Sequence, residues 1–228
     1  MPDDVISIDE IIQKRTPSQL KDWVKQAMDR YNLSEEGHRQ LVLHEGLAKP
    51  LMEEVFNLAE FGIKKFGNTD KILIQPIIGS QNYDAEISDL DTDPPNISFI
   101  EVTQAHEGED EYLRSVVLAE KGIVTLRGPV IKRGTKKTGR QINVPYTATD
   151  VIQNVKEELM RIVEAAKRKN GKDYPPNTSL LIAFDDGLTF QRVISEKQLD
   201  DFVTRHIITL DLRVSTLYLL GWSKYYRE

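Results

Sequence analysis

The chain has 228 residues, no cysteine and a formal net charge of −6. A chain of this length buries roughly 70% of its unfolded surface on folding, so it needs no disulfides or metal ions for stability. The lack of cysteine excludes disulfides and thiolate metal sites. The acidic balance argues against nucleic-acid binding over the whole surface, and no apolar run approaches the roughly 18 residues of a membrane span. We therefore expect a cytoplasmic protein that has no membrane partner.

The N-terminal third has a helical pattern. Residues 1–36 are polar and predict an N-terminal helical extension to an α/β domain that spans 37–228. Within 37–66, apolar residues recur every three or four positions, which predicts one long helix with a break or kink at Pro50.

After residue 70 the sequence pattern changes to short runs of β-forming residues, which are separated by Gly, Ser, Asn and Asp-Pro-Pro. These runs are 71–79, 82–88 and 96–104. Runs of this length with turn residues between them predict a three-stranded antiparallel meander.

The second half alternates helices and strands. Helical periodicity marks 109–122, 147–170 and 196–207, whereas 179–186 and 214–222 are apolar strand-like runs. A hairpin is expected between the first two of these helices, with residues 134–139 at its tip. This order predicts an α/β (α+β) fold, in which a mixed central sheet is flanked by helices.

The predicted hairpin is strongly basic. Residues 127–140 carry six positive charges and no acid: Arg127, Lys132, Arg133, Lys136, Lys137 and Arg140. A charge run is often no more than a solvated loop. On an arm with three glycines, however, it also suits phosphate contacts that do not depend on base sequence. We predict that this arm contacts the backbone of DNA or RNA.

Two acids on the predicted strands suggest a metal site. Glu101 interrupts an apolar run, SFIEV, and a buried carboxylate is costly unless it is paired, hydrogen-bonded or bound to a cation. Asp84 lies on the neighbouring strand, although a purely structural acid is the competing interpretation there. Carboxylates on adjacent strands suit Mg²⁺ or Mn²⁺, so we predict that Asp84 and Glu101 hold one of these ions. Glu53, Glu54 and Glu60 offer a third acid, with no pattern that selects one.

With its acids so placed, the chain resembles the PD-(D/E)xK nuclease superfamily, which has a restriction-endonuclease-like fold. The resemblance covers roughly residues 40–190. It aligns the superfamily's first acid with Asp84, in NYDAEI, and the second with Glu101, in FIEVTQ, 17 positions later. The superfamily's lysine falls on Thr103, and Gln104 beside it faces the opposite way on an ideal strand. The resemblance is thus to a divergent member that lacks the motif lysine, with Asp84, Glu101, Thr103 and Gln104 in the catalytic region.

Two functions remain open at this stage. One is a Mg²⁺- or Mn²⁺-dependent nuclease that acts on nucleic-acid phosphodiesters, and the other is a catalytically inactive nuclease-fold module that binds a partner. Some superfamily members are similar in moving the lysine to another element, for which Lys64, Arg114 and Lys121 are candidates here. The retained acids favour the nuclease, and the missing lysine favours the module. DNA and RNA are not distinguished, and a homodimer is left open.

Overall fold

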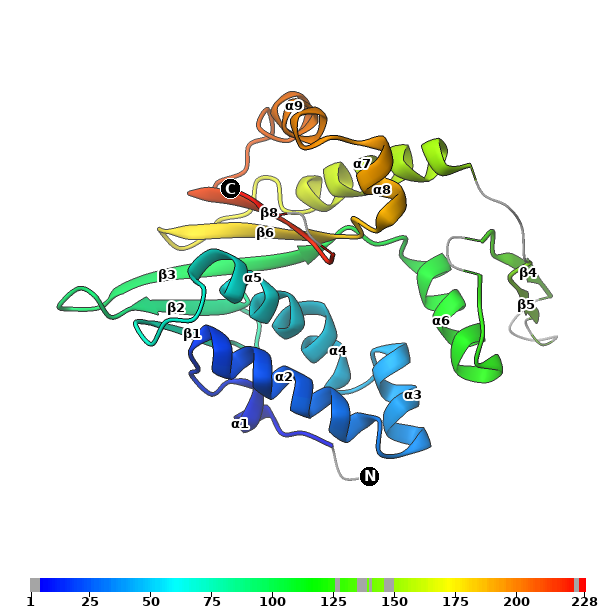
Figure 1. Ribbon diagram of the computed structural model, residues 1–228, viewed down its shortest axis with the longest axis horizontal. Coiled ribbons are helices and arrows are strands. Elements are labelled where there is room, and N and C mark those ends of the chain that lie inside the picture. Colours follow the sequence, from blue (N-terminus) through cyan, green and yellow to red (C-terminus); the bar gives the residue numbers. More distant parts are fainter. Residues whose placement is uncertain (1–4, 126–127, 135–138, 140, 146–149, 224–225) are drawn as a thin grey trace.

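The structure is a computed structural model that describes residues 5–125, 128–134, 139, 141–145, 150–223 and 226–228. It contains a mixed six-stranded sheet, with strand order β1-β2-β3-β6-β7-β8, that is flanked by helices (Figure 1). The predicted α/β fold class is therefore confirmed. Within those ranges, no helix has both the length and the apolar character that crossing a bilayer needs.

The N-terminal part is helical and shares its core with the sheet. Its segments are α1 (Ile8–Ile11), α2 (Pro17–Tyr31), α3 (Glu35–Leu43), α4 (Ala48–Pro50), the π-helical segment η1 (Leu51–Val55) and α5 (Phe56–Phe66). Leu20 and Val24 of α2 belong to the same buried cluster as Ile74 and Ile100 of the sheet. The predicted helical extension thus packs directly on the domain.

The prediction of one long helix over 37–66 is wrong, because the structure has two helical runs there. The two runs are separated by residues 44–47, where His44 ends α3 in the left-handed conformation with φ 52°. Pro50 does not break the helix, because it lies in the first turn of the next helical run, where a backbone N–H has no partner within the helix. The run continues from Pro50 through η1 into α5.

The predicted three-stranded meander is confirmed. Strands β1 (Ile72–Pro76), β2 (Ala85–Asp89) and β3 (Asn96–Gln104) pair antiparallel in that order, with Ala85 opposite Ile100. Ile100 and Val102 of β3 belong to the core cluster that includes α5. Because side chains alternate along a strand, Glu101 and Thr103 point to the other face, toward the layer that holds α7.

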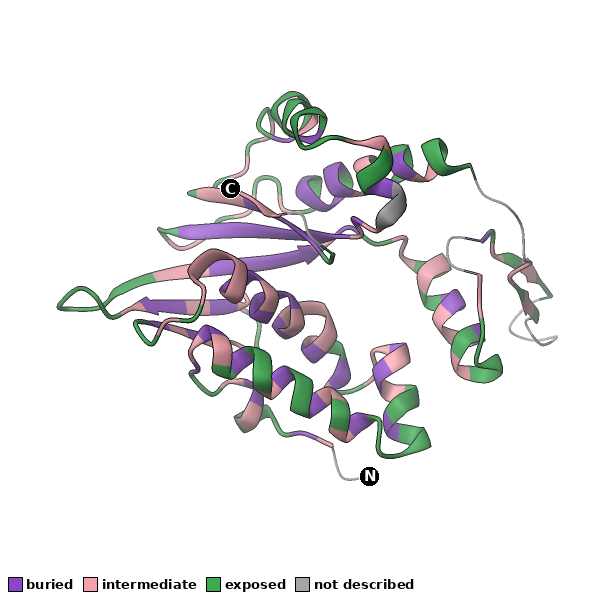
Figure 2. Ribbon diagram, viewed as in Figure 1, coloured by how far each residue is buried: buried purple, intermediate pink, exposed green. Residues whose placement is uncertain are grey.

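The second half supplies the parallel part of the sheet. Its elements are α6 (Glu109–Lys121), β4 (Ile131–Arg133), β5 (Gln141–Asn143), α7 (Val151–Lys167), β6 (Thr178–Phe184), α8 (Leu188–Val193), α9 (Glu196–His206), β7 (Thr216–Gly221) and β8 (Tyr226–Arg227). β6 is buried along its whole length and pairs parallel with β3 and β7 (Figure 2). β4 and β5 form the predicted hairpin, whose tip residues 135–138 lie outside the described residues.

Candidate active site

Asp84 and Glu101 lie together near the centre of the sheet. Asp84 directly precedes β2, and its Oδ2 accepts a hydrogen bond of 2.6 Å from the Val102 N–H, which fixes the carboxylate beside β3. Glu101 is only 4% exposed. Burial, and secondly the charge of Glu101, raise the pKa of Asp84 to about 6. Two carboxylates that repel each other in this way form the core of the candidate site.

A lysine neutralises Glu101, and it comes from an element that the sequence did not indicate. Lys169, in the turn after α7, donates a hydrogen bond to Glu101 Oε1, and the Nζ of Lys172 lies 3.7 Å from the same oxygen. Lys169 is 68 residues from Glu101 in the chain. The helix α7 itself was predicted, but its sequence does not indicate that the turn after it comes to lie beside Glu101.

The three cations proposed from the sequence lie elsewhere. Lys64 donates to the backbone oxygen of Gly221 at 3.1 Å. Arg114 is buried, forms an ion pair with Glu107 and donates to the Gly128 oxygen at 3.0 Å. Lys121 is exposed at the end of α6. The cations at the acid pair are therefore Lys169 and, at a longer distance, Lys172.

Thr103 and Gln104 have different surroundings. Thr103 is 8% exposed and lies on the same face of β3 as Glu101. The Gln104 Nε2 donates to the backbone oxygens of Met52 and Glu53, each at 3.2 Å, so this side chain ties β3 to η1. Gln104 thus positions the helical wall of the site.

Among the three acids of the first helical region, Glu54 faces the site. Burial raises its pKa to about 7, and the charges of Asp84, Glu53 and Glu101 add to the effect. Glu53 instead accepts from His44, and Glu60 pairs with Lys21. The π-helical turn shifts side chains away from the regular α-helical progression, and such turns are frequent at functional sites.

Asp84, Glu54 and Lys169 border an open cleft of about 420 Å³, which we call the acid cleft, and Glu101 is buried beside it. Its acids come from η1 and the start of β2, and its cations come from the turn after α7. The lining residues are Glu53, Glu54, Asp84, Val102, Thr103, Gln104, His106, Arg168, Lys169 and Lys172. Opposite charges thus face each other across a space that is open to solvent.

A buried hydroxyl beside the acids lacks a partner. The Tyr174 Oη is inaccessible to solvent and makes no hydrogen bond within the described part of the chain. Burial raises the pKa of Tyr174 above its usual range, with the charges of Glu101 and Asp84 contributing. The hydroxyl therefore stays protonated and is an unused donor next to the carboxylates.

The chemistry of these oxygen ligands fits a hard divalent cation. No three His, Asp or Glu side chains in the described ranges are arranged as a complete metal-binding group. Mg²⁺, however, is commonly held by one or two carboxylates together with water and substrate phosphate. Like charges help to raise the pKa values of both Asp84 and Glu54, and a bound cation would relieve that repulsion.

The basic hairpin is described only in part. Arg127, Lys136, Lys137 and Arg140 lie outside the described residues. Lys132 forms ion pairs with Glu109 at 2.8 Å and Asp110 at 2.9 Å, and Arg133 is exposed. A phosphate at Lys132 would compete with two acids, so nucleic-acid contact through the hairpin stays a prediction.

Glu54→Gln should stabilise the protein at alkaline pH. Because the folded pKa of Glu54 is about 7 and its ordinary value is 4.5, the stability that its proton contributes is present below pH 4.5 and lost as the pH rises through 7. Glutamine removes the charge, so we expect a gain of about 1 kcal/mol at alkaline pH, since Glu54 is partly screened by solvent.

Thermal melting measures this gain as a rise of about 2–4 °C that shrinks toward about pH 5. Glu60→Gln, further along the same helical run, is the control and should show no such pH-dependent rise. An equal melting temperature for Glu54→Gln and wild type at every pH would show that Glu54 is not held near the other acids.

Comparison of the chain with protein-family models, with curated proteins and with solved structures found no match. The interpretation of the site therefore depends on the sequence pattern and on the geometry described above.

Proposed function

We propose that this protein is a metal-dependent phosphodiesterase that hydrolyses nucleic acid. The observation that supports it most is the ammonium of Lys169 at Glu101, next to Asp84. Two carboxylates and a lysine are the set that the PD-(D/E)xK resemblance requires. In this chain the turn after α7 supplies the lysine, in place of strand position 103.

The residues of the acid cleft divide into metal ligands and phosphate-binding groups. Asp84, which lines the cleft, and Glu101, which is buried beside it, would hold Mg²⁺ or Mn²⁺ together with water and substrate phosphate, and Glu54 is a further acid of the cleft. The ion, when bound, would polarise a phosphate and make water a stronger nucleophile. Lys169 would orient an attacking water and stabilise charge on the phosphate oxygens. Arg168 and Lys172, on the same turn, bind the flanking phosphate oxygens.

A non-catalytic binding module is the second candidate function. One observation favours it: Glu101 already has a cation in Lys169, so its burial needs no metal ion to offset it. Thr103 supplies no charge on that face of β3. In a module of this kind, Lys169 and Glu101 would be a structural ion pair.

A cleavage assay separates the two functions. The purified protein is incubated with end-labelled single-stranded DNA, duplex DNA and RNA, each with Mg²⁺, with Mn²⁺ or with a chelator. The phosphodiesterase should cleave at least one substrate with metal and none with the chelator. Absence of cleavage under all conditions would support the module, and cleavage in the chelator would contradict both candidates.

A further inference from the structure

A second cavity opens directly beside the acid cleft. It has a volume of about 470 Å³, and we call it the side pocket. Its lining residues are Val42, Leu43, His44, Lys49, Glu53, Gln104, His106, Gly108, Glu109, Glu111, Tyr112 and Ser115. Glu53, Gln104 and His106 line both cavities, so the side pocket and the acid cleft are adjacent.

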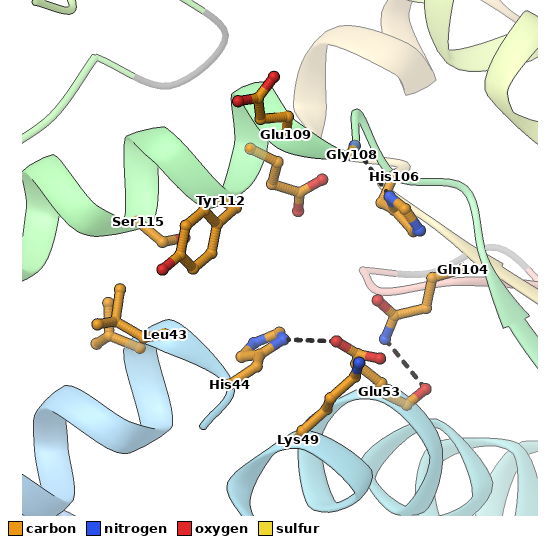
Figure 3. A pocket seen from close by; sticks show the side chains of 12 residues that line it. Leu43, His44, Lys49, Glu53, Gln104, His106, Gly108, Glu109, Tyr112 and Ser115 are labelled. Carbon is orange, nitrogen blue, oxygen red and sulfur yellow. Dashed lines mark hydrogen bonds and ion pairs between the residues drawn. The ribbon is translucent and has the colours of Figure 1, made fainter. Parts of the chain in front are cut away.

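The side pocket offers ring surfaces together with polar groups. Tyr112 of α6 is 49% exposed, and Figure 3 shows its ring on one wall, with His44 across from it and His106 near Gln104. His106 also lines the acid cleft. A flat ring that stays half-exposed beside a cavity is a surface on which a nucleobase can stack. Small-molecule sites usually occupy about 300–1,000 Å³, so the volume suits one nucleoside.

The acids of the side pocket are each engaged by another group. Glu53 Oε1 lies 3.3 Å from His44 Nδ1, Glu109 pairs with Lys132, and Glu111 accepts from the Glu107 N–H at 3.0 Å. Lys49 makes no ion pair with any described residue. Lys49 is therefore the cation of the side pocket that can contact a phosphate, and each of the three carboxylates has a hydrogen-bond or ion-pair partner.

The helices around the side pocket determine whether a single strand or a duplex can enter it. α3 packs against α6, and the side pocket lies between these two helices and the end of β3. A base inside it is separated from its neighbours in the strand. Bases of a regular duplex are stacked and paired, so entry would require extrusion of the base, whereas an unpaired nucleotide enters without that cost.

We propose that the side pocket binds the nucleoside next to the phosphodiester in the acid cleft, and that the substrate is therefore a single-stranded nucleic acid. This inference rests on the proposed function for the place of the phosphodiester. The base stacks on Tyr112, and Lys49 contacts its phosphate.

Binding to oligonucleotides, measured without cleavage, tests the inference. Fluorescence anisotropy is recorded in a chelator at fixed low salt, with one DNA oligonucleotide as a single strand and as a blunt duplex. Wild type should bind the single strand about ten-fold more tightly. Tyr112→Ala should lose about ten-fold in affinity for the single strand, Tyr112→Phe should retain it, and both should bind the duplex as wild type does.

Leu118→Ala is the matched control, because Leu118 is an exposed apolar residue of the same helix that does not line the side pocket. It should bind like wild type. Equal affinity for strand and duplex, no measurable binding, or an unchanged Tyr112→Ala would each overturn the inference. Because no hydrolysis is needed, a single-strand preference without cleavage would contradict only the proposed function, and cleavage with a duplex preference would contradict only the side pocket.

Discussion

Glu101→Gln is expected to abolish metal-dependent cleavage and to leave a folded protein. Glutamine has nearly the same shape as glutamate but lacks the charge that holds a divalent cation. Mutation of a residue that only hydrogen-bonds to a metal ligand typically lowers the metal affinity or the activity by about 10–100-fold. We therefore expect the rate to fall by at least about 100-fold when a ligand itself is neutralised, as measured with Mn²⁺ on the substrate that wild type cleaves best.

The same substitution also has a cost in stability. Lys169 loses a charged partner, and its side chain is only 16% exposed. A largely buried charge with a weaker acceptor destabilises the fold by about 1–3 kcal/mol. The melting temperature should fall by about 2–10 °C, so the cleavage assay has to be run well below it.

Glu86→Gln is the matched control for Glu101→Gln. Glu86 lies on β2, two residues from Asp84, and forms a surface ion pair with Lys14 at 3.2 Å. It should cleave like wild type, since exposed pairs contribute little. If Glu101→Gln cleaves like this control, Glu101 has no role in catalysis and the Lys169–Glu101 pair is structural.

Local patterns account for most of the predicted fold. Each run between 71 and 104 is short, β-rich and bounded by turn residues, and each became a strand of the meander. The apolar run 179–186 has no polar alternation because β6 is covered on both faces, and that is typical of a central parallel strand. By contrast, α8 has six residues and β8 has two, too few to show a period.

The break in the first helical region shows where local rules failed. Proline was the strongest breaker in 37–66, yet the chain turns at His44, an ordinary residue in a left-handed conformation. Gly46, with φ 57°, lies in the same turn, and the two helical runs on either side of it have different partners: α3 packs against α6, and the run from Ala48 onward packs toward β3. The π-helical segment η1, further along the same run, carries Glu54, which lines the acid cleft.

Only the part of the candidate site that lies on two paired, consecutive strands was predictable from the sequence. Asp84 and Glu101 were found because they fall in neighbouring predicted strands and Glu101 interrupts an apolar run. Lys169 and Tyr174 belong to the connection between α7 and β6, and nothing in their own segment indicates where it meets β3. They reach the site through the parallel pairing of β6 with β3.

Lys169→Met is expected to remove most of the cleavage activity, and a lysine at position 103 should restore part of it. If Lys169 stabilises charge on the phosphate, its loss should lower the rate by about 10²–10³-fold, as for the loss of one charge-stabilising donor in other enzymes. Thr103 lines the acid cleft on the same strand face as Glu101, about 7 Å further along β3. A lysine there can extend into the same cleft from the position where the superfamily carries it.

Comparison of Lys169→Met with Lys169→Met/Thr103→Lys distinguishes catalysis from simple support of the fold. Lys167→Met is the control, because Lys167 is exposed on α7 and pairs with Glu164; it should cleave like wild type. Melting temperatures are recorded for all variants, since Lys169→Met leaves Glu101 buried without its cation and should destabilise the protein. A rate at least about ten-fold higher in the double variant than in Lys169→Met would show that the ammonium takes part in catalysis. A lysine at position 103 would not restore cleavage if Lys169 only formed a structural ion pair. Full activity in Lys169→Met, or a folded double variant as inactive as the single one, would contradict the role that we assign to Lys169.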